Sequence, residues 1–226
     1  MELFILAAVV ALGVAIYKLV AAQKRREAFF LLANKLGFTY SHHDSEGLVH
    51  LPFALFREGD GRGVENVLAG TTDDRLVRLF DYWYYDERRD TDGDRHRSYE
   101  RFSCAMTTLE ASGPPLVLKR EGFFSRLADH AGFRDIDLES EDFNRRYELK
   151  CDDRRFAVAL IDARMIQWLL DHGQDCRYEV VGDRLLCATG RCAPERLPWV
   201  LDQLHSFRDH VPSVVGDLYP HPEVTK

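Results

Sequence analysis

The polar run Glu139–Tyr147 is the part of the sequence richest in side chains that could recognise another molecule. It places Glu141 and Asp142 shortly before Arg145 and Arg146. Ser140 could cap a single helical turn whose positive end carries the acids and whose negative end carries the arginines. Local electrostatics would then explain most of the run. The alternative is a partner-binding surface, because carboxylate and guanidinium groups also form strong charge-assisted hydrogen bonds across interfaces.

A second group of charges, residues 152–155, follows soon after and could extend the first into one carboxylate–guanidinium network. Such a network would recognise a partner through paired charges. The candidate interaction residues of these two groups are Glu141, Asn144, Arg145, Arg146, Asp153 and Arg155.

The aromatic run Phe80–Tyr85 is the other candidate recognition feature. Strand alternation places Phe80, Tyr82 and Tyr84 on one face and Asp81, Trp83 and Tyr85 on the other. Aromatic side chains on both faces favour a central strand that is covered on each side. A partly exposed aromatic surface is the alternative, since Tyr and Trp are common anchors of binding patches. Tyr82 and Tyr84 are its candidate residues.

Signals for metal binding and catalysis are weak. The acidic segment Asp90–Asp94 has its glycine at the fourth position of a possible calcium loop, where the sixth is required, and Arg101 at the twelfth. Two mixed groups could hold zinc, but buried cysteines are common without any metal. They are His42, His43, Asp44 and His50, and, as the better set, His172, Cys176, Cys187 and Cys192. No P-loop, nucleophile elbow or zinc-protease motif is present. We predict no catalytic residue, metal or cofactor.

Composition indicates a globular chain that is not a nucleic-acid-binding protein. The 226 residues are 46% hydrophobic and 12% aromatic, which is enough apolar material for one packed domain. The net charge of -7 repels phosphate polyanions, so we expect no nucleic-acid partner. The five cysteines are odd in number and irregularly spaced. This pattern predicts no disulfide framework and fits a reducing compartment.

Residues 3–22 are predicted to cross a lipid bilayer. They contain one charge, Lys18, and a helix of this length spans about 30 Å, the thickness of the hydrocarbon layer. A cleaved signal peptide would need a basic start and a small-residue cleavage site, and a buried core helix would show a polar stripe. Here the start carries Glu2 and no basic side chain, Val20–Gln23 is a poor cleavage site, and no polar stripe appears before residue 18. A single membrane-spanning anchor therefore fits best.

The charges beside this segment predict its orientation. Lys24, Arg25 and Arg26 follow the span, whereas no basic side chain precedes it. The positive-inside rule then places the remaining chain in the cytoplasm, at a bacterial inner membrane.

The elements that follow predict an α+β fold, a mostly antiparallel sheet with packed helices. We expect a juxtamembrane helix over 23–37 that continues from the anchor (1–22), a globular domain over 38–218 and a flexible tail over 219–226. The expected strands are Leu48–Phe56, Val64–Thr71, Leu76–Tyr85, Tyr99–Leu109, Leu116–Leu118, Asp135–Leu138, Tyr147–Cys151 and Phe156–Leu160, with a hairpin of Tyr178–Val181 and Arg184–Ala188. The expected helices are a short one containing Phe124–Ala131, one from Asp162 to Gly173, and Pro198–His210. Glycines 59–63 are expected to form a turn, Asp86–Ser98 a hairpin loop, and Pro114-Pro115 a chain break.

Several of these segments together resemble an uncharacterised bacterial family of membrane-anchored proteins that carry a domain of unknown function. The resemblance covers about residues 38–185 and rests on Glu141–Leu149, Asp153–Leu160, Met165, Trp168–Leu170, Leu48–Phe56, Ala69–Thr71 and Phe80–Tyr82. It implies a membrane-tethered domain and supplies no catalytic residues. The single N-terminal span departs from the commoner layout of that family.

The predicted anchor and the lack of catalytic motifs together favour a cytoplasmic-facing binding or adaptor domain with a protein partner at the membrane. The first alternative is a membrane-tethered enzyme whose acid and base groups come from scattered Asp, Glu and His residues. A lipid-headgroup module is the second, and the acidic net charge disfavours it.

Overall fold

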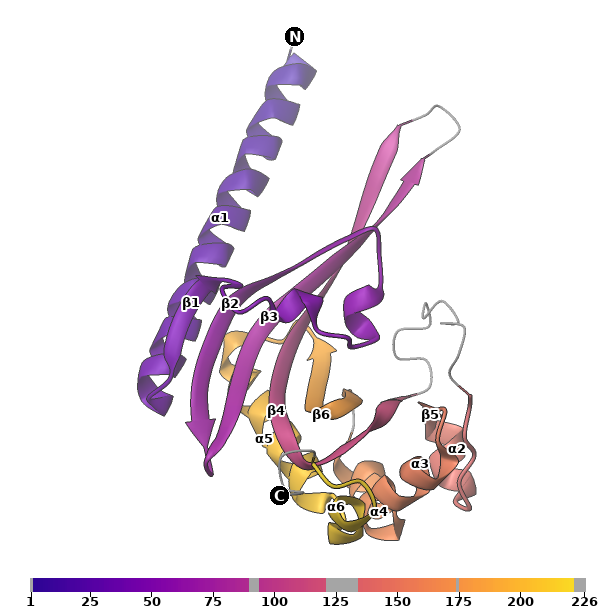
Figure 1. Ribbon diagram of the computed structural model, residues 1–226. Helices are drawn as coiled ribbons and strands as arrows, with labels where there is room; N and C mark the ends of the chain where they lie inside the picture. The colour runs from indigo at the N-terminus through magenta and orange to yellow at the C-terminus, as the bar shows by residue number, and fades with distance from the viewer. Residues whose placement is uncertain (1, 90–93, 121–133, 174, 222–226) are drawn as a thin grey trace.

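The computed structural model describes residues 2–89, 94–120, 134–173 and 175–221 and has the expected α+β class (Figure 1). Its sheet contains β1 (Thr39–His43), β2 (Gly61–Thr72), β3 (Arg75–Arg89), β4 (Arg95–Arg120), β5 (Tyr147–Cys151) and β6 (Arg177–Gly190). The strand order is β1-β2-β3-β4-β5, and β6 also pairs with β4. All these pairs are antiparallel.

The long strand β4 organises the sheet. Its first part pairs with β3 and its last part with β5, while β6 follows the opposite edge from Phe102 to Leu118. The β4–β6 register shifts on either side of Gly113, which faces Gly182. Bulges increase strand twist and bending. The bent β4 thus carries the chain from one end of the domain to the other.

Helix α1 (Glu2–Leu36) is one continuous helix with two different environments. The side chains described between Phe4 and Val20 are exposed, whereas Arg25, Phe29 and Ala33 are buried. These three residues recur every four positions, so they form one helical stripe that packs on the sheet. The first half of α1 projects away from the domain (Figure 1). One helix therefore covers the expected anchor and the juxtamembrane stretch.

The two faces of the sheet have separate hydrophobic cores. One face, with Val77 and Leu79, packs against α1 and α5 (Leu197–His210) and continues under α2 (Glu141–Arg146), α3 (Arg154–Leu160), α4 (Ala163–His172) and α6 (Ser213–Leu218). The other face, with Phe80 and Tyr82, is covered by the segment 48–58. The middle of strand β3, from Val77 to Tyr82, is therefore covered on both sides, as the aromatic residues on both faces predict, whereas Trp83 and Tyr85 are half-buried.

The segment Leu48–Phe56 is not a strand, contrary to prediction. It forms two short 3-10 helices, η1 (Leu48–His50) and η2 (Leu55–Arg57). The backbone amides of Leu48 and Val49 donate hydrogen bonds to the Asp44 carboxylate. Those of Ala54 and Leu55 donate to the Glu179 carboxylate. Side chains therefore satisfy backbone donors that a neighbouring strand would otherwise bind.

The segment Phe156–Leu160 also differs from prediction, because it belongs to helix α3. The Asp153 side chain accepts hydrogen bonds from the amides of Arg155 and Phe156. This N-cap starts a helix that the β-branched and aromatic residues alone did not indicate.

The predicted hairpin around Gly182-Asp183 is instead the single strand β6. Gly182 has a φ of 61°, which lets the strand bulge without turning back. Strand β4 likewise passes through Pro114-Pro115, which lie beside the register shift near Gly113 rather than at a break. Gly61 and Gly63 lie inside β2, and Asp135 makes one isolated bridge to Lys150 in place of a strand.

Other expectations hold or fall outside the described chain. Helix α4 begins after Asp162, whose side chain accepts a hydrogen bond from the Met165 amide. Helix α2 begins after Ser140, whose hydroxyl accepts one from the Phe143 amide. Strands β3 and β4 reach Arg89 and Arg95, so the expected loop Asp86–Ser98 is shorter than predicted. The expected helix at 124–131, the loop tip at 90–93 and the end of the tail at 222–226 lie outside the described residues.

Candidate functional site

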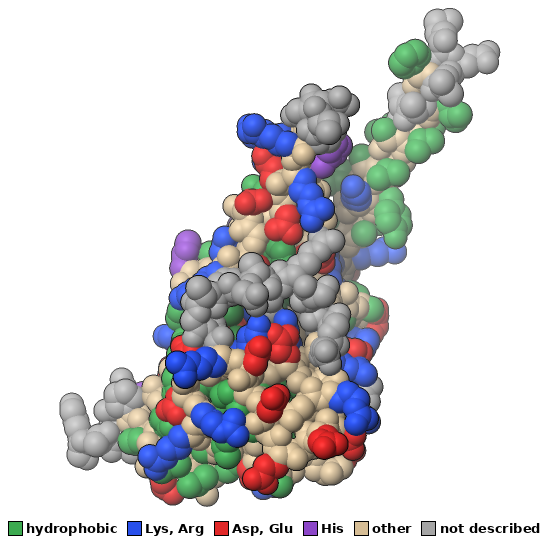
Figure 2. All heavy atoms as spheres, turned by 90° about the vertical axis from the view of Figure 1, so that its right-hand side faces the viewer, with side chains coloured by type: hydrophobic (Ala, Val, Ile, Leu, Met, Phe, Trp, Pro, Cys, Tyr) green, Lys and Arg blue, Asp and Glu red, His purple; other side chains and the backbone are tan. Residues whose placement is uncertain are grey.

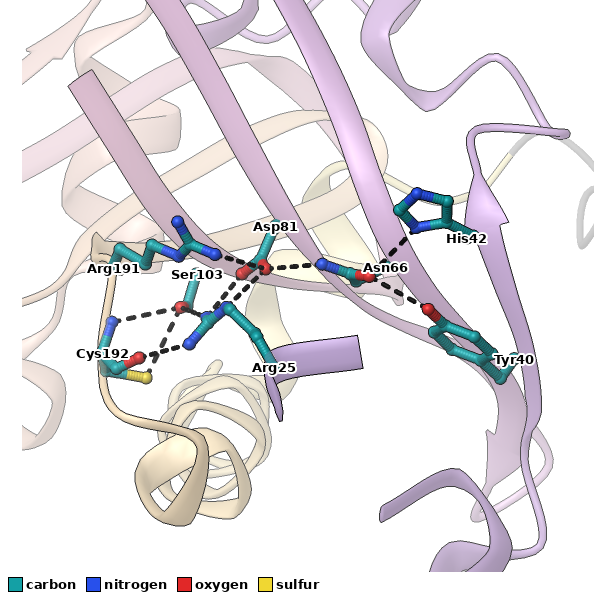
Figure 3. Close-up of polar contacts among 8 residues, drawn as sticks. All are labelled: Arg25, Tyr40, His42, Asn66, Asp81, Ser103, Arg191 and Cys192. Carbon is teal, nitrogen blue, oxygen red and sulfur yellow. Dashed lines mark hydrogen bonds and ion pairs between the residues drawn. The ribbon is translucent and has the colours of Figure 1, made fainter. Parts of the chain in front are cut away.

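A buried polar cluster joins the anchor helix to the sheet (Figure 3). Arg25 of α1 donates from Nε to Asp81 Oδ2 and from Nη2 to Asp81 Oδ1, both at 2.6 Å. Arg25 and Asp81 are 5% and 2% exposed, so the pair is shielded from water. A bidentate pair fixes both distance and orientation, which a single hydrogen bond would not do.

Further contacts of Arg25 bring β4 and the segment that directly follows β6 into the cluster. Its Nη2 donates to Ser103 Oγ at 3.0 Å, and its Nη1 donates to the Cys192 carbonyl at 2.7 Å. Arg191 Nη2 lies 4.0 Å from Asp81 Oδ2. The pKa of Arg191 is lowered, chiefly because burial disfavours the charged guanidinium group. The Asp81 carboxylate opposes this shift, and the nearby Arg25 adds to it. The Asp81 carboxylate therefore has two arginines beside it.

Asn66 extends the cluster toward the edge strand β1. Its Nδ2 donates to Asp81 Oδ2 at 3.1 Å, and its Oδ1 accepts from the Tyr40 hydroxyl at 3.0 Å. His42 Nδ1 lies 3.3 Å from the same oxygen. Asn66 has a φ of 56° and occupies the register shift between Glu65 and Leu68. This left-handed conformation is one that Asn tolerates better than most residues, and it turns the amide inward.

A shallow hollow of about 490 Å³ lies beside the cluster, between α1 and β1. Tyr40 and His42 form its sheet side, and Gln23, Glu27 and Phe30 form part of its helix side. Phe30 is 50% exposed and meets the Tyr40 ring edge-on at 6.3 Å. Burial raises the pKa of Tyr40, so its hydroxyl stays a neutral hydrogen-bond donor. The hollow gives access to the outer end of the cluster.

The predicted charged candidates have local structural roles. The Asn144 side chain makes two hydrogen bonds to the backbone of Leu138, at 3.0 and 2.7 Å. Asp153 caps α3 and accepts from the Tyr219 hydroxyl at 2.7 Å. Arg145 lies 3.5 Å from Asp142 of its own helix.

The remaining charged candidates, Glu141, Arg146 and Arg155, are exposed around this region. Among the described residues, the ion pairs near residues 141–155 do not form the network that the sequence suggested.

Tyr82 and Tyr84 lie in the interior of the sheet. They are 1% and 4% exposed, and the Tyr82 hydroxyl donates to the Leu55 carbonyl at 3.0 Å. Interior packing therefore accounts for both. The exposed Tyr99 and the half-buried Trp83 and Tyr85 are on the opposite face of the hairpin.

A second hollow, of about 830 Å³, lies where the β2–β3 turn and β4 meet α5 and α6. Its Asp73 and Asp209 both pair with Arg208, and its Glu110 pairs with Arg75. All three acidic side chains are more than half exposed. The hollow therefore holds no shielded acid–base pair among the described residues. No group of three potential metal ligands occurs in the described part of the chain either, and all five cysteines are free thiols.

Comparison with known proteins gives one structural likeness. No family model matches the chain, and no curated protein matches it. The crystal structure of the mycobacterial trehalose monomycolate transport factor A, TtfA, superimposes with a TM-score of 0.56 at 16% identity. The match covers 84% of this chain and 95% of that one. At such low identity the likeness shows a shared fold.

Sequence reasoning missed the Arg25–Asp81 pair, although both residues carried a signal. Arg25 is one of three basic residues that directly follow the apolar span. Asp81 is the one acid within the aromatic run Phe80–Tyr85. A lone carboxylate in a strand covered on both faces needs a buried cation or several donors, because an unpaired buried charge is costly. That argument predicts a partner for Asp81 without identifying it.

Proposed function

We propose that this chain is a single-pass membrane-anchored adaptor whose α+β domain binds a protein partner at the cytoplasmic face of a bacterial inner membrane. The observation that carries the proposal is the rigid continuity from anchor to domain. One helix contains the exposed apolar half and the buried Arg25, and Arg25 is held by two hydrogen bonds to the central strand β3. A flexible linker would leave the orientation of the domain free, whereas this junction sets it relative to the anchor.

The apolar half of α1 supports bilayer insertion. Among the described residues, it is the one helix long and apolar enough to cross a membrane, and none of its most apolar window is buried against the domain. Exposed residues include Phe4, Ile5, Leu6, Leu12 and Leu19, each more than half exposed. So large an apolar surface is stable in lipid and is an aggregation hazard in water.

The charge distribution supports the cytoplasmic orientation. Arg25 is neutralised within the buried pair, which leaves Lys18, Lys24 and Arg26 as the exposed basic residues beside the span. Lys24 and Arg26 follow the span and Lys18 lies near its far end, so the exposed basic residues still gather on the side that the positive-inside rule places in the cytoplasm.

The structural neighbour supports a membrane-associated role other than catalysis. That protein is a mycobacterial trehalose monomycolate transport factor. By analogy, the partner we propose is an integral membrane protein that moves a lipid-like substrate, and the domain would position or activate it.

Orientation is tested by labelling a cysteine on intact cells. Ser45 is exposed, so Ser45→Cys in a Cys192→Ser background gives one accessible thiol, since the other four cysteines are buried. We expect a membrane-impermeant maleimide to label it only after the cells are opened. Labelling of intact cells would reverse the assigned orientation.

Partner binding is tested by cross-linking the full chain in native membranes. A matched chain in which residues 3–20 are replaced by an unrelated apolar span serves as the control. We expect both chains to capture the same integral membrane protein in stoichiometric amounts, because the domain supplies the contact. If only the chain with the native span captured the partner, or if neither chain captured a specific protein, the adaptor proposal would be contradicted.

A further inference from the structure

A hollow of about 540 Å³ lies beside the segment that joins η1 to the start of β2, on the face of the sheet opposite α1. Its lining contains three residues with basic side chains, His50, Arg57 and Arg62. Among the described residues, no acidic side chain lines it. The remaining side chains of the lining are apolar and belong to Val49, Leu51, Pro52 and Phe56. We call this cavity the basic hollow.

A lining whose charged side chains are all basic is unusual on this molecule. Figure 2 shows Lys and Arg side chains interspersed with Asp and Glu over the visible face. Several arginines of the sheet pair with carboxylates, for example Arg78 with Glu46 at 2.7 Å. Arg57, in contrast, is exposed and has no ion pair in the described part of the chain. The basic hollow is therefore a local positive site on a chain whose net charge is -7.

The nearest acidic residues along the chain are held by other groups. Glu58 is 7% exposed, and its carboxylate accepts a hydrogen bond from Arg177 Nη1 at 2.6 Å. The Asp60 carboxylate accepts one from the Glu87 amide at 2.7 Å. Within the described ranges, neither carboxylate forms an ion pair with an arginine of the hollow. The positive charge of the hollow is therefore available to a ligand.

Arg62 is held in place by backbone groups rather than by a carboxylate. Its Nη2 donates to the Gly59 carbonyl at 2.8 Å, and its Nη1 donates to the Phe56 carbonyl. These two bonds leave other N–H donors of the guanidinium group free and do not neutralise its charge. A guanidinium group that is already positioned loses less conformational freedom when it binds an anion.

The two other basic residues end short helices that are fixed to the domain. His50 is the last residue of η1, and Arg57 is the last residue of η2. The Asp44 carboxylate accepts a hydrogen bond from the first amide of η1, and the Glu179 carboxylate accepts one from the first amide of η2. The backbone thus sets the positions from which all three basic side chains reach the hollow.

We propose that the basic hollow binds a phosphate ester, with the phosphate beside Arg57, Arg62 and His50 and the ester group against the apolar lining. Guanidinium groups bind phosphate through paired, charge-assisted hydrogen bonds. A phosphate monoester carries nearly two negative charges and three terminal oxygens, which match two cations and an imidazole N–H. A carboxylate has one charge and two oxygens, so it matches this set of side chains less well.

The size of the basic hollow suits a small ligand. Sites for small molecules enclose about 300–1,000 Å³, and the basic hollow is within that range. Phosphate esters occur both as soluble molecules and as lipid headgroups, and the test below distinguishes these two sources. The inference goes beyond the proposed adaptor function, because it needs neither the partner protein nor the orientation of the anchor.

The test is isothermal titration calorimetry of the full chain in dodecyl maltoside micelles, with a titration into empty micelles subtracted. Hexyl phosphate is the first probe, and we expect it to bind in a 1:1 ratio. Inorganic phosphate should bind more weakly because it has no apolar group to place on the lining. Hexanoate should bind at least about tenfold more weakly than hexyl phosphate, because it has a smaller charge and one oxygen fewer.

The source of the ester is determined with dihexanoyl phosphatidylglycerol, a short-chain lipid. Tighter binding of this lipid than of hexyl phosphate would assign the hollow to a lipid headgroup, and weaker binding would assign it to a soluble ester. Hexanoate that binds as tightly as hexyl phosphate would overturn the assignment to phosphate.

Two substitutions with the same charge change provide the matched control. Arg57→Gln lies in the hollow and Arg164→Gln lies on α4, and both side chains are exposed. We expect Arg57→Gln to weaken the binding of hexyl phosphate about tenfold, because a hydrogen bond between charged groups is lost. Arg57→Lys should recover part of this loss, since it keeps the charge but not the paired donors. Arg164→Gln should leave the binding unchanged.

Thermal unfolding of each variant checks that the fold is intact, and we expect no change because both arginines are exposed. Equal effects of Arg57→Gln and Arg164→Gln would overturn the site, because the binding would then depend only on the total charge of the chain. No measurable binding of hexyl phosphate to the folded parent chain would also overturn it.

Discussion

Arg25 and Asp81 are 56 residues apart in the sequence and form a bidentate ion pair at the junction of the anchor helix and the central strand. The pair is enclosed by Ser103 and the Cys192 carbonyl on one side and by Asn66 on the other. A buried ion pair is not a strong source of net stability, because both charges lose their hydration. Its contribution here is geometric, since it fixes where the anchor crosses the sheet.

Removal of one partner of this pair should be strongly destabilising. Arg25→Ala leaves the Asp81 carboxylate buried without its main cation, and we expect a loss of about 3–5 kcal/mol in the free energy of unfolding. Chemical denaturation of the full chain in detergent micelles measures it. Arg26→Ala is the neighbouring control, and it should change stability by less than about 0.5 kcal/mol because Arg26 is exposed.

The double substitution Arg25→Met with Asp81→Leu is compared with the single substitutions Arg25→Met and Asp81→Leu in a mutant cycle. It should cost less than either single substitution, because no unpaired charge remains. A double variant as unstable as the sum of the two single ones would show that the pair is not coupled, contrary to the geometry.

Sequence reasoning predicted the parts of this fold that local physics determines. Ser140 and Asp162 start helices because each side chain accepts a hydrogen bond from the amide three residues later, and this spacing is visible in a sequence. The apolar anchor and the two-sided cover of Phe80–Tyr85 follow from composition and alternation in the same way. These features were predictable because each depends on residues close together in the chain.

The errors arose where distant residues determine the local structure. Segment 48–58 is bound by Glu179, more than 120 residues away, and thus forms short helical turns instead of a strand. Gly182 allows a bulge opposite Gly113, where a turn was expected. The Arg25–Asp81 site depends on a contact of the same kind. Hydrophobic periodicity contains no information about which distant carboxylate will satisfy a given amide or guanidinium group.

The left-handed conformation of Asn66 leads to a second prediction. Asn66→Ala removes the hydrogen bond to the buried Asp81 and places at a φ of 56° a residue that tolerates the left-handed region less well than Asn. We expect a loss of about 2 kcal/mol, about half of it from the backbone conformation. Asn66→Gly should recover about 1 kcal/mol of this, because glycine adopts positive φ freely.

The control for Asn66 is Asp74, which has a φ of 60° in the exposed β2–β3 turn. Asp74→Ala has the backbone cost without loss of a buried hydrogen bond, so it should be clearly milder than Asn66→Ala. Equal losses in thermal denaturation would mean that the Asn66 side chain contributes nothing to the cluster.

Gly113 gives a third prediction, which concerns the bulge of β4. An added Cβ would lie 2.2 Å from the Phe156 ring, and that ring is fully buried between the sheet and α6. Gly113→Ala should therefore cost about 1–3 kcal/mol through overpacking. Gly190→Ala is the matched control at the end of β6, where nothing lies within 4 Å of the new Cβ. If both variants unfold at the same denaturant concentration as the parent, the tight contact at Gly113 is absent in solution.

The partly buried His205 of α5 predicts how stability depends on pH. Burial lowers its pKa, the nearby Arg208 lowers it further, and Asp209, Asp73 and Asp202 oppose the shift. The folded state therefore binds fewer protons at this site than the unfolded state, whose histidine titrates near about 6.5. The contribution of neutral His205 to stability is complete above that pH and decreases as the pH falls toward the lower folded-state pKa. His205→Gln removes the titration, so we expect the variant to lose less stability than the parent between about pH 7.5 and 5.5. Unfolding curves of both proteins at several pH values measure the difference, and parallel pH profiles would contradict the shift at His205.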